Sequence, residues 1–252
     1  MRPLVIALPV LLLALGMSSP TVFHESATPS EIQEPKPPAK FKPYKYKTHK
    51  IQGWTVLVQK ELQSKTKLRT EVLNLLNIQL WRINQQLPEE VTDRLHEITL
   101  RVHLDREGNP GAVYHPSEEW LRENGFPKDW AGGVEFGNAE NFLTWSQQQP
   151  MMALHELSHA WHHQVLGYDH SGILNALKEV RAAKTLENVT LFDGGKAEHY
   201  ALSNEMEFFA EMSEAWWGHN DFYPFVRGEL VEDFPAIPPL MRECWQLPKS
   251  GK

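Results

Sequence analysis

The spacing of apolar residues predicts a chain that is mostly helical, with a few short strands. Leucine and isoleucine recur every three or four residues over residues 66–87, which predicts a long amphipathic helix that ends before Pro88. Apolar and polar residues alternate over residues 98–104, which predicts a strand with one buried face. Further strands are predicted at residues 54–58 and 134–136, and further helices at residues 117–124, 173–183, 204–217, 224–231 and 238–245.

The clearest pattern lies in residues 151–167, MMALHELSHAWHHQVLG. One side of this helix is apolar and would hold it against a core, through Ala153, Leu157, Ala160 and Trp161. The other side carries His155 and His159, which are one turn apart and can therefore reach one metal ion. Glu156 points beside the metal, where a carboxylate can take a proton from metal-bound water. This H-E-x-x-H arrangement is a signature of zinc peptidases.

A third metal ligand is expected on the helix predicted at residues 204–217, NEMEFFAEMSEAWW. Glu207, Glu211 and Glu214 share one face of this helix, whereas Glu205 points away from Glu207. A second acid one helical turn after a carboxylate ligand can support the metal site. It accepts a hydrogen bond from the N–H of a ligand histidine that faces away from the metal. The spacing therefore favours Glu207 as the ligand and Glu211 as the acid behind the histidine.

Other third ligands fit less well. The metzincin pattern requires glycine seven residues and histidine ten residues after the first ligand, where this chain has His162 and Val165. His162 and His163 lie within two turns of the ligand face, but a straight helix cannot wrap three such side chains round one tetrahedral ion. These two histidines are therefore expected either to contact the ligand residues or to pack in the core.

The chain also resembles a known family, the zinc peptidase domain of anthrax lethal factor and its relatives. The resemblance is carried by the H-E-x-x-H motif and by YALSNEMEFFAE at residues 200–211. It covers residues 155–211 closely and becomes faint before residue 134. It implies a zincin-like α+β fold, with Glu156 as general base and Tyr200 stabilising the oxyanion. The implied zinc ligands are His155, His159 and Glu207. The chain is too short for the other domains of lethal factor, so nothing about toxin action follows.

The strand predicted at residues 134–136 comes shortly before the motif helix. In zinc peptidases, an edge strand in this position commonly receives the substrate backbone by strand addition. Gly132, Gly133 and Gly137 would permit such a close approach, or they mark simple turns. Both interpretations stay open here.

The N-terminal part has a different composition. Arg2 precedes an apolar run at residues 4–15 and then small residues, which predicts a secretory signal peptide at residues 1–18. Residues 19–50 are rich in proline and lysine and are predicted to be an extended linker. Residues 51–247 then form the metallopeptidase domain. A secreted or periplasmic protein is expected, with no stable membrane insertion after signal removal; an uncleaved anchor is the alternative.

Charge and cysteine content narrow the function further. The first fifty residues carry a net charge of +4, so the other 202 carry −11 of the total of −7. An acidic domain argues against a nucleic acid partner. The single cysteine, Cys244, excludes an internal disulfide and is expected to be buried packing. His96, His103 and His115 are expected to be ordinary surface histidines.

The sequence thus predicts a secreted, single-domain zinc endopeptidase acting on a peptide or protein substrate. Its expected architecture is a small mixed sheet packed on the active-site helix, with a helical C-terminal part. One alternative is a catalytically idle metal-binding module, which the presence of Glu156 and Tyr200 disfavours. Another is a zinc amidase or deacetylase acting on cell-wall material, which uses similar ligands.

Overall fold

The computed structural model describes residues 43–246. The predicted signal peptide at residues 1–18, and the predicted linker up to residue 42, lie outside the described residues. The export expected from them stays a prediction. Among residues 43–246, no helix combines the length and the apolar character needed to cross a membrane.

The protein is a mixed α/β structure with a small five-stranded sheet. The strand order is β1-β2-β3-β5-β4, with β2, β3 and β5 parallel and an antiparallel strand at each edge. The strands are β1 (Tyr46–Ile51), β2 (Trp54–Gln59), β3 (Leu100–Val102), β4 (Ala112–Tyr114) and β5 (Val134–Phe136). The expected small mixed sheet is therefore present.

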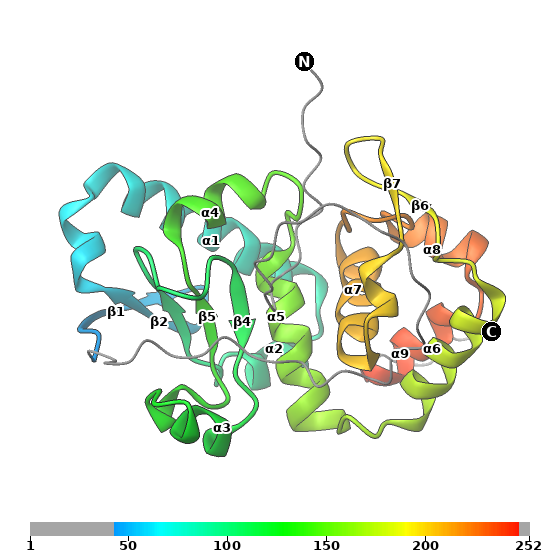
Figure 1. The fold of residues 1–252 in the computed structure, drawn as a ribbon, viewed down its shortest axis with the longest axis horizontal. Helices are drawn as coiled ribbons and strands as arrows, with labels where there is room; N and C mark the ends of the chain where they lie inside the picture. Colours follow the sequence, from blue (N-terminus) through cyan, green and yellow to red (C-terminus); the bar gives the residue numbers. More distant parts are fainter. Residues whose placement is uncertain (1–42, 247–252) are drawn as a thin grey trace, which may run out of the picture.

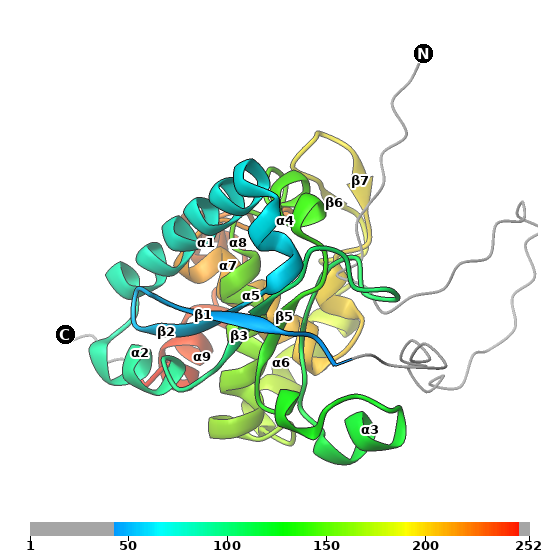
Figure 2. The same ribbon diagram turned by 90° about the vertical axis from the view of Figure 1, so that its left-hand side faces the viewer.

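Most helices of the N-terminal half pack on this sheet. The predicted long helix is α1 (Thr66–Gln86), which buries the apolar positions Val72, Leu76, Leu80 and Ile83. Figure 2 shows α1 along one side of the sheet and α3 on the opposite side. The other helical segments are η1 (Lys60–Ser64), α2 (Glu89–Leu95), α3 (Glu118–Glu123), η2 (Lys128–Trp130) and α4 (Ala139–Trp145).

The motif helix forms the centre of the molecule. It runs as α5 (Met152–Trp161), continues as the π-helical turn η3 (His162–Leu166), and ends at Gly167, whose φ of 81° favours glycine. Every residue of α5 is buried. Figure 1 shows α5 between the sheet and α7 (Glu205–Trp217), so the two segments expected to hold the metal lie side by side.

The C-terminal part is helical, as expected. It contains α6 (Ser171–Ala183), the hairpin β6 (Val189–Thr190) and β7 (Lys196–Ala197), η4 (Tyr200–Leu202), α7, α8 (Arg227–Asp233) and α9 (Ile237–Cys244). Cys244 is fully buried, which confirms its predicted packing role. The indole N–H of Trp161 donates to the Cys244 carbonyl at 2.9 Å, and the Trp161 ring stacks on Trp245. These contacts join α5 to α9.

One boundary predicted from the sequence was wrong, and one strand was not predicted. The folded domain begins before residue 51, because β1 occupies residues 46–51 and its first five residues fall in the predicted linker. An edge strand needs only backbone pairing on one side, so exposed lysines such as Lys47 and Lys50 do not prevent it. In addition, residues 112–114 form strand β4, which the pattern of apolar residues did not predict. Strand β4 takes the edge, whereas β5 is interior, so the strand at residues 134–136 is not an edge that could receive a substrate.

Two histidines expected at the surface are buried instead. His103 and His115 are both less than a tenth exposed and lie close to Glu135, with His115 Nε2 2.9 Å from the Glu135 carboxylate. Burial raises the pKa of Glu135, but the hydrogen bond from His115 and the charge of Arg106 bring it down to about 2. Burial also lowers the pKa of His103 to about 4. The polar side of β3 therefore faces a second, polar core.

Candidate metal centre

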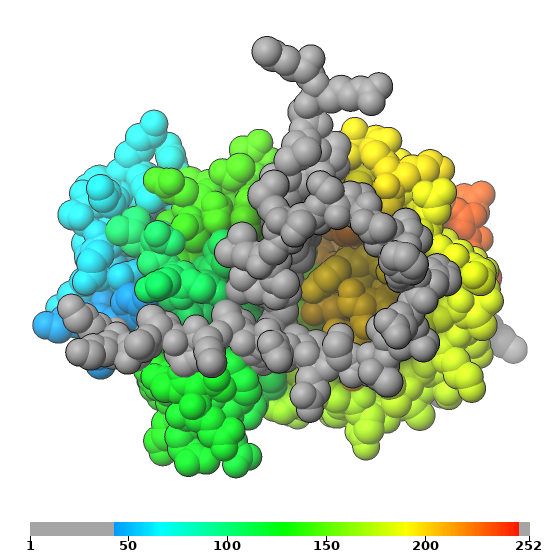
Figure 3. All heavy atoms as spheres, viewed as in Figure 1, coloured from blue at the N-terminus to red at the C-terminus, as the bar shows by residue number. Residues whose placement is uncertain are grey.

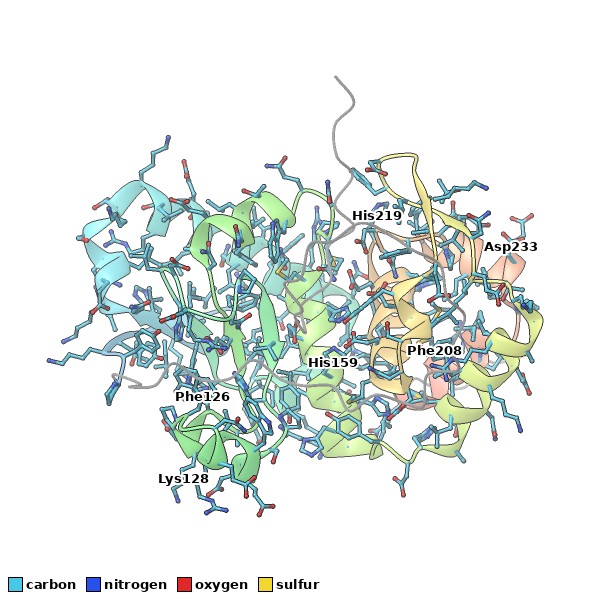
Figure 4. The ribbon with its side chains drawn as sticks, viewed as in Figure 1. Phe126, Lys128, His159, Phe208, His219 and Asp233 are labelled. Atoms are coloured by element: carbon cyan, nitrogen blue, oxygen red, sulfur yellow. The ribbon has the colours of Figure 1, made fainter. Side chains whose placement is uncertain are left out.

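The ligand-bearing side chains come from two helices packed against each other. Figure 4 labels His159 on α5 and Phe208 on the facing α7. Helix α7 begins at a defined residue because the side chain of Asn204 accepts a hydrogen bond from the backbone N–H of Glu207 at 2.9 Å. This cap places Glu207 in the first turn, opposite the imidazoles of α5. In the space-filling view of Figure 3, part of α7 is visible in ochre between the green and the yellow-green segments.

The three predicted ligands converge. His155 Nε2 lies 3.1 Å from Glu207 Oε2, and His159 Nε2 lies 3.4 Å from the same oxygen. The three residues form a group that could hold a metal ion. Burial raises the pKa of the Glu207 carboxyl, but the two imidazoles outweigh burial and bring this pKa below its usual range. Glu207 is therefore a charged carboxylate facing two nitrogens.

The second ring nitrogen of His155, Nδ1, also has partners. Its Nδ1 lies 2.7 Å from Glu214 Oε1, and Gln149 donates to the same oxygen at 3.0 Å. Glu211, the residue expected in this role, lies 3.6 Å from His155 Nδ1. Burial by itself lowers the pKa of His155, but hydrogen bonds to Glu207 and Glu214 raise it well above its usual value. The acid that hydrogen-bonds to the ligand histidine is thus Glu214, two turns after Glu207, whereas Glu211, the acid predicted for this role, lies farther from the same nitrogen.

Glu211 belongs to a deeper polar layer. Its carboxylate accepts from the Asn220 amide at 3.0 Å and lies 3.9 Å from His199 Nδ1. Burial, together with the nearby carboxylates of Glu214 and Asp221, raises the pKa of Glu211 well above its usual range. Burial and Glu214 likewise raise the pKa of Asp221 to about 7. Glu211 and Asp221 therefore belong to a largely buried acidic layer behind His155.

Glu156 lies beside the ligand group and is 1% exposed. Oε1 of Glu156 is buried and has no hydrogen-bond partner within residues 43–246. Burial raises the pKa of Glu156, although the neighbouring His159 and His155 pull it down. The carboxylate therefore lies buried beside the two imidazoles, with an oxygen that is available for a proton.

Tyr200 lies in η4, just before α7, and its ring is partly buried. Its hydroxyl is hydrogen-bonded to Glu207. Burial raises the pKa of Tyr200, and the carboxylates of Glu207, Glu211 and Glu156 raise it further. The phenol therefore keeps its proton and stands at the ligand group as a donor.

The remaining sequence candidates have packing or supporting contacts. His162 is fully buried against the rings of Phe209 and Tyr168, and burial lowers its pKa to about 3. His163 Nδ1 lies 2.9 Å from the Tyr114 hydroxyl. Glu205 is in the first turn of α7 and is absent from the groups of described residues that could hold a metal. Sequence reasoning missed Gln149 and Tyr114, because neither belongs to the motif segments.

No family model, no curated protein and no solved structure matches this chain. The class of site therefore follows from the geometry alone. Two imidazoles and one carboxylate, all from two facing helices, form a buried group that could hold a metal ion in a mixed α/β protein. A second acid orients one imidazole, and a buried carboxylate and a phenol flank the group.

The contact between His155 and Glu214 leads to a testable difference between two isosteric variants. Glu214→Gln is expected to weaken metal binding by about 10- to 100-fold, because the partner of a ligand histidine sets its orientation and basicity. Glu211→Gln is the matched control and is expected to have a smaller effect, because Glu211 lies 3.6 Å from the same nitrogen, beyond hydrogen-bond distance. Competition titration with a chelator measures both affinities. Equal effects, or a larger effect at Glu211, would contradict this assignment.

Proposed function

We propose that this protein is a secreted zinc-dependent endopeptidase with a zincin-like fold. The observation that carries the proposal is the convergence of His155, His159 and Glu207, with Glu156 buried beside them. A metal-storage or purely structural site needs ligands but no buried carboxylate with one unbonded oxygen. The resemblance of residues 155–211 to the lethal factor peptidase domain supports the same reaction class, and residues 1–18 support export.

The spacing of the donor atoms fits zinc. Two ligand atoms at about 2.0–2.1 Å from a tetrahedral ion lie about 3.3 Å from each other. The distances from Glu207 Oε2 to His155 Nε2 and His159 Nε2 are 3.1 and 3.4 Å. Two nitrogens and one carboxylate oxygen are also a donor set typical of catalytic zinc, which leaves a fourth position for water or substrate.

A bound zinc ion supplies Lewis-acid chemistry, which polarises the scissile carbonyl and lowers the pKa of water. Glu156 takes a proton from the attacking water and delivers it to the leaving amine. Its raised pKa suits both steps, because a base with a pKa nearer to neutrality can also return the proton. Tyr200 donates its hydroxyl to the carbonyl oxygen as this oxygen becomes negatively charged.

The open edge of the sheet supports a peptide substrate. In β4, the backbone N–H of His115 donates to Gly133, so the alternating groups of Ala112 and Tyr114 face away from β5. That side of β4 lies beside α5. An extended peptide can add to such an edge through main-chain hydrogen bonds. Strand β4 therefore takes the role that the sequence suggested for residues 134–136.

Metal analysis combined with a peptide-library assay tests the proposed function. The purified protein is expected to contain about one zinc per chain and to cleave internal peptide bonds, with activity lost to a chelator and restored by zinc. Cell-wall fragments and acetylated substrates are assayed in parallel. Cleavage of these alone would make the protein an amidase or deacetylase, and bound zinc without any turnover would make it a binding module.

Tyr200→Phe is expected to lower kcat by about 10²- to 10³-fold, because it removes one donor to the oxyanion and keeps the ring. KM, zinc content and melting temperature are expected to change little, since the hydroxyl matters most in the transition state. The matched control is Tyr223→Phe, which loses a hydroxyl bonded to Asp233 near α8. A normal kcat for Tyr200→Phe would leave Tyr200 as a packing residue.

A further inference from the structure

A buried glutamine lies on the far side of His155 from the ligand group. Gln149 is in the turn between α4 and α5 and is 7% exposed. Its side-chain N–H donates to Glu214 Oε1 at 3.0 Å, and its Nε2 lies 3.5 Å from His155 Nδ1. Carboxylate oxygens accept hydrogen bonds, so the amide of Gln149 must present its NH2 group to Glu214. Glu214 Oε1 therefore accepts from two donors, of which one is the ligand histidine.

The other carboxylate oxygen of Glu214 does not help to fix this side chain. Oε2 is buried and has no hydrogen-bond partner within residues 43–246. The terminal torsion of a glutamate side chain is soft, so a carboxylate that is bonded through a single contact can turn about its own axis. The bond from His155 Nδ1 at 2.7 Å is one contact, and the bond from Gln149 is the second. Two donors from different segments set the plane of the carboxylate, which one donor does not.

The turn that carries Gln149 is fixed at both ends by Gln79 of α1. Gln79 is 1% exposed, on a helix face that is otherwise apolar. Its Nε2 donates to Ser146 Oγ at 3.1 Å, where α4 ends, and its Oε1 accepts from the Ala153 N–H at 2.9 Å, where α5 begins. Burial of a glutamine costs free energy unless it is hydrogen-bonded, and here both ends of the amide are bonded. Gln149 therefore extends from a turn whose place beside α5 is defined.

We propose that Gln149 is a positioning residue, which fixes the carboxylate plane of Glu214 and thereby holds the imidazole of His155 in the orientation that binds the metal. This inference rests on the proposed function, because it takes His155 as a zinc ligand. An imidazole that donates from Nδ1 can bind a metal only through Nε2, which is the nitrogen 3.1 Å from Glu207. Gln149 acts through Glu214 and takes no part in the reaction itself.

Zinc affinity gives the first test. Gln149→Met keeps a side chain of similar length and removes the amide donor. Its zinc affinity is expected to fall by about 10-fold, the lower end of the effect of removing the hydrogen-bond partner of a ligand. The matched control is Gln148→Met, which changes the neighbouring, exposed residue of the same turn and is expected to bind zinc normally. Competition with a chelator measures both affinities.

A double variant separates positioning from a general loss of packing. Once Glu214→Gln has removed the carboxylate, Gln149→Met is expected to weaken zinc binding by less than about 2-fold further, because the group that Gln149 positions is gone. If Gln149 only fills space, its replacement should lower the affinity by the same factor in both backgrounds. Additive losses would therefore overturn the positioning role.

Hydrogen exchange at the His155 ring gives a test that needs neither zinc nor activity. In the metal-free protein, the Nδ1 proton that is bonded to Glu214 is expected to exchange with water about 10-fold faster in Gln149→Met, because the carboxylate can then turn away from it. Gln148→Met should keep the exchange rate of the unmodified protein. NMR spectra of protein labelled with ¹⁵N in the histidine rings report this proton directly.

These measurements separate the inference from the proposed function. Faster exchange and weaker zinc binding in Gln149→Met, in a protein that cleaves no peptide, would overturn the function and keep the positioning role. An unchanged zinc affinity or an unchanged exchange rate in Gln149→Met would overturn the inference alone, whatever the protein cleaves.

Discussion

Glu156→Gln is expected to abolish nearly all turnover, with a fall in kcat of about 10³- to 10⁴-fold, while the fold and the metal content stay unchanged. The amide has the same shape as the carboxylate but can neither take nor return a proton, and general acid–base catalysis contributes about 10²- to 10⁴-fold. The residue is buried, and glutamine fills the same volume there, so the packing of α5 is expected to be kept.

Three measurements are needed to interpret that variant. Zinc content and melting temperature show that the site is assembled, and steady-state kinetics with the best library peptide give kcat and KM separately. Glu140→Gln on α4 is a suitable control, since this acid is exposed and lies outside the ligand groups. Turnover near that of the unmodified protein would exclude the proposed mechanism.

Glu207→Ala is expected to have the largest effect on metal binding. It removes the only carboxylate oxygen that lies within 3.4 Å of both imidazole Nε2 atoms among the described residues. The loss of affinity should exceed the loss of about 10- to 100-fold that is typical when the hydrogen-bond partner of a ligand is removed. Two histidines alone leave a zinc ion with too few protein ligands for a stable catalytic site.

Glu205→Ala is the matched control, because Glu205 lies in the same first turn of α7 and carries the same charge. Its zinc affinity is expected to be nearly normal. Both affinities can be measured by competition with a chelator, together with the residual metal after dialysis. A larger loss for Glu205→Ala than for Glu207→Ala would show that the ligand face of α7 had been assigned to the wrong side.

The local part of the site could be predicted because helical periodicity is a property of neighbouring residues. His155 and His159 are one turn apart in any α-helix, so their shared face follows from the sequence. Asn204 precedes an acidic first turn, and its side chain caps α7 as such residues do. The same periodicity places Glu207 and Glu205 on different faces of α7. The grouping of His155, His159 and Glu207 in the structure agrees with that expectation.

The sequence could not decide whether Glu211 or Glu214 is the acid that hydrogen-bonds to His155. Both residues share the face of Glu207, and an acid one turn away is the nearer candidate along a single helix. The distance from His155 Nδ1 depends instead on how α5 crosses α7, and there Glu214 is at 2.7 Å and Glu211 at 3.6 Å. Gln149, which is outside both helices, fills the remaining place beside Glu214.

Residue spacing along the chain thus determined which side chains share a helix face, including the H-E-x-x-H group, the face of Glu207 and the long helix α1. Only the tertiary structure decided that Glu214 orients His155, that β4 rather than β5 forms the edge, and that His103 and His115 are buried around Glu135. Each of these depends on pairing between segments far apart in the chain. Such contacts are set by packing and strand order, which local periodicity does not encode.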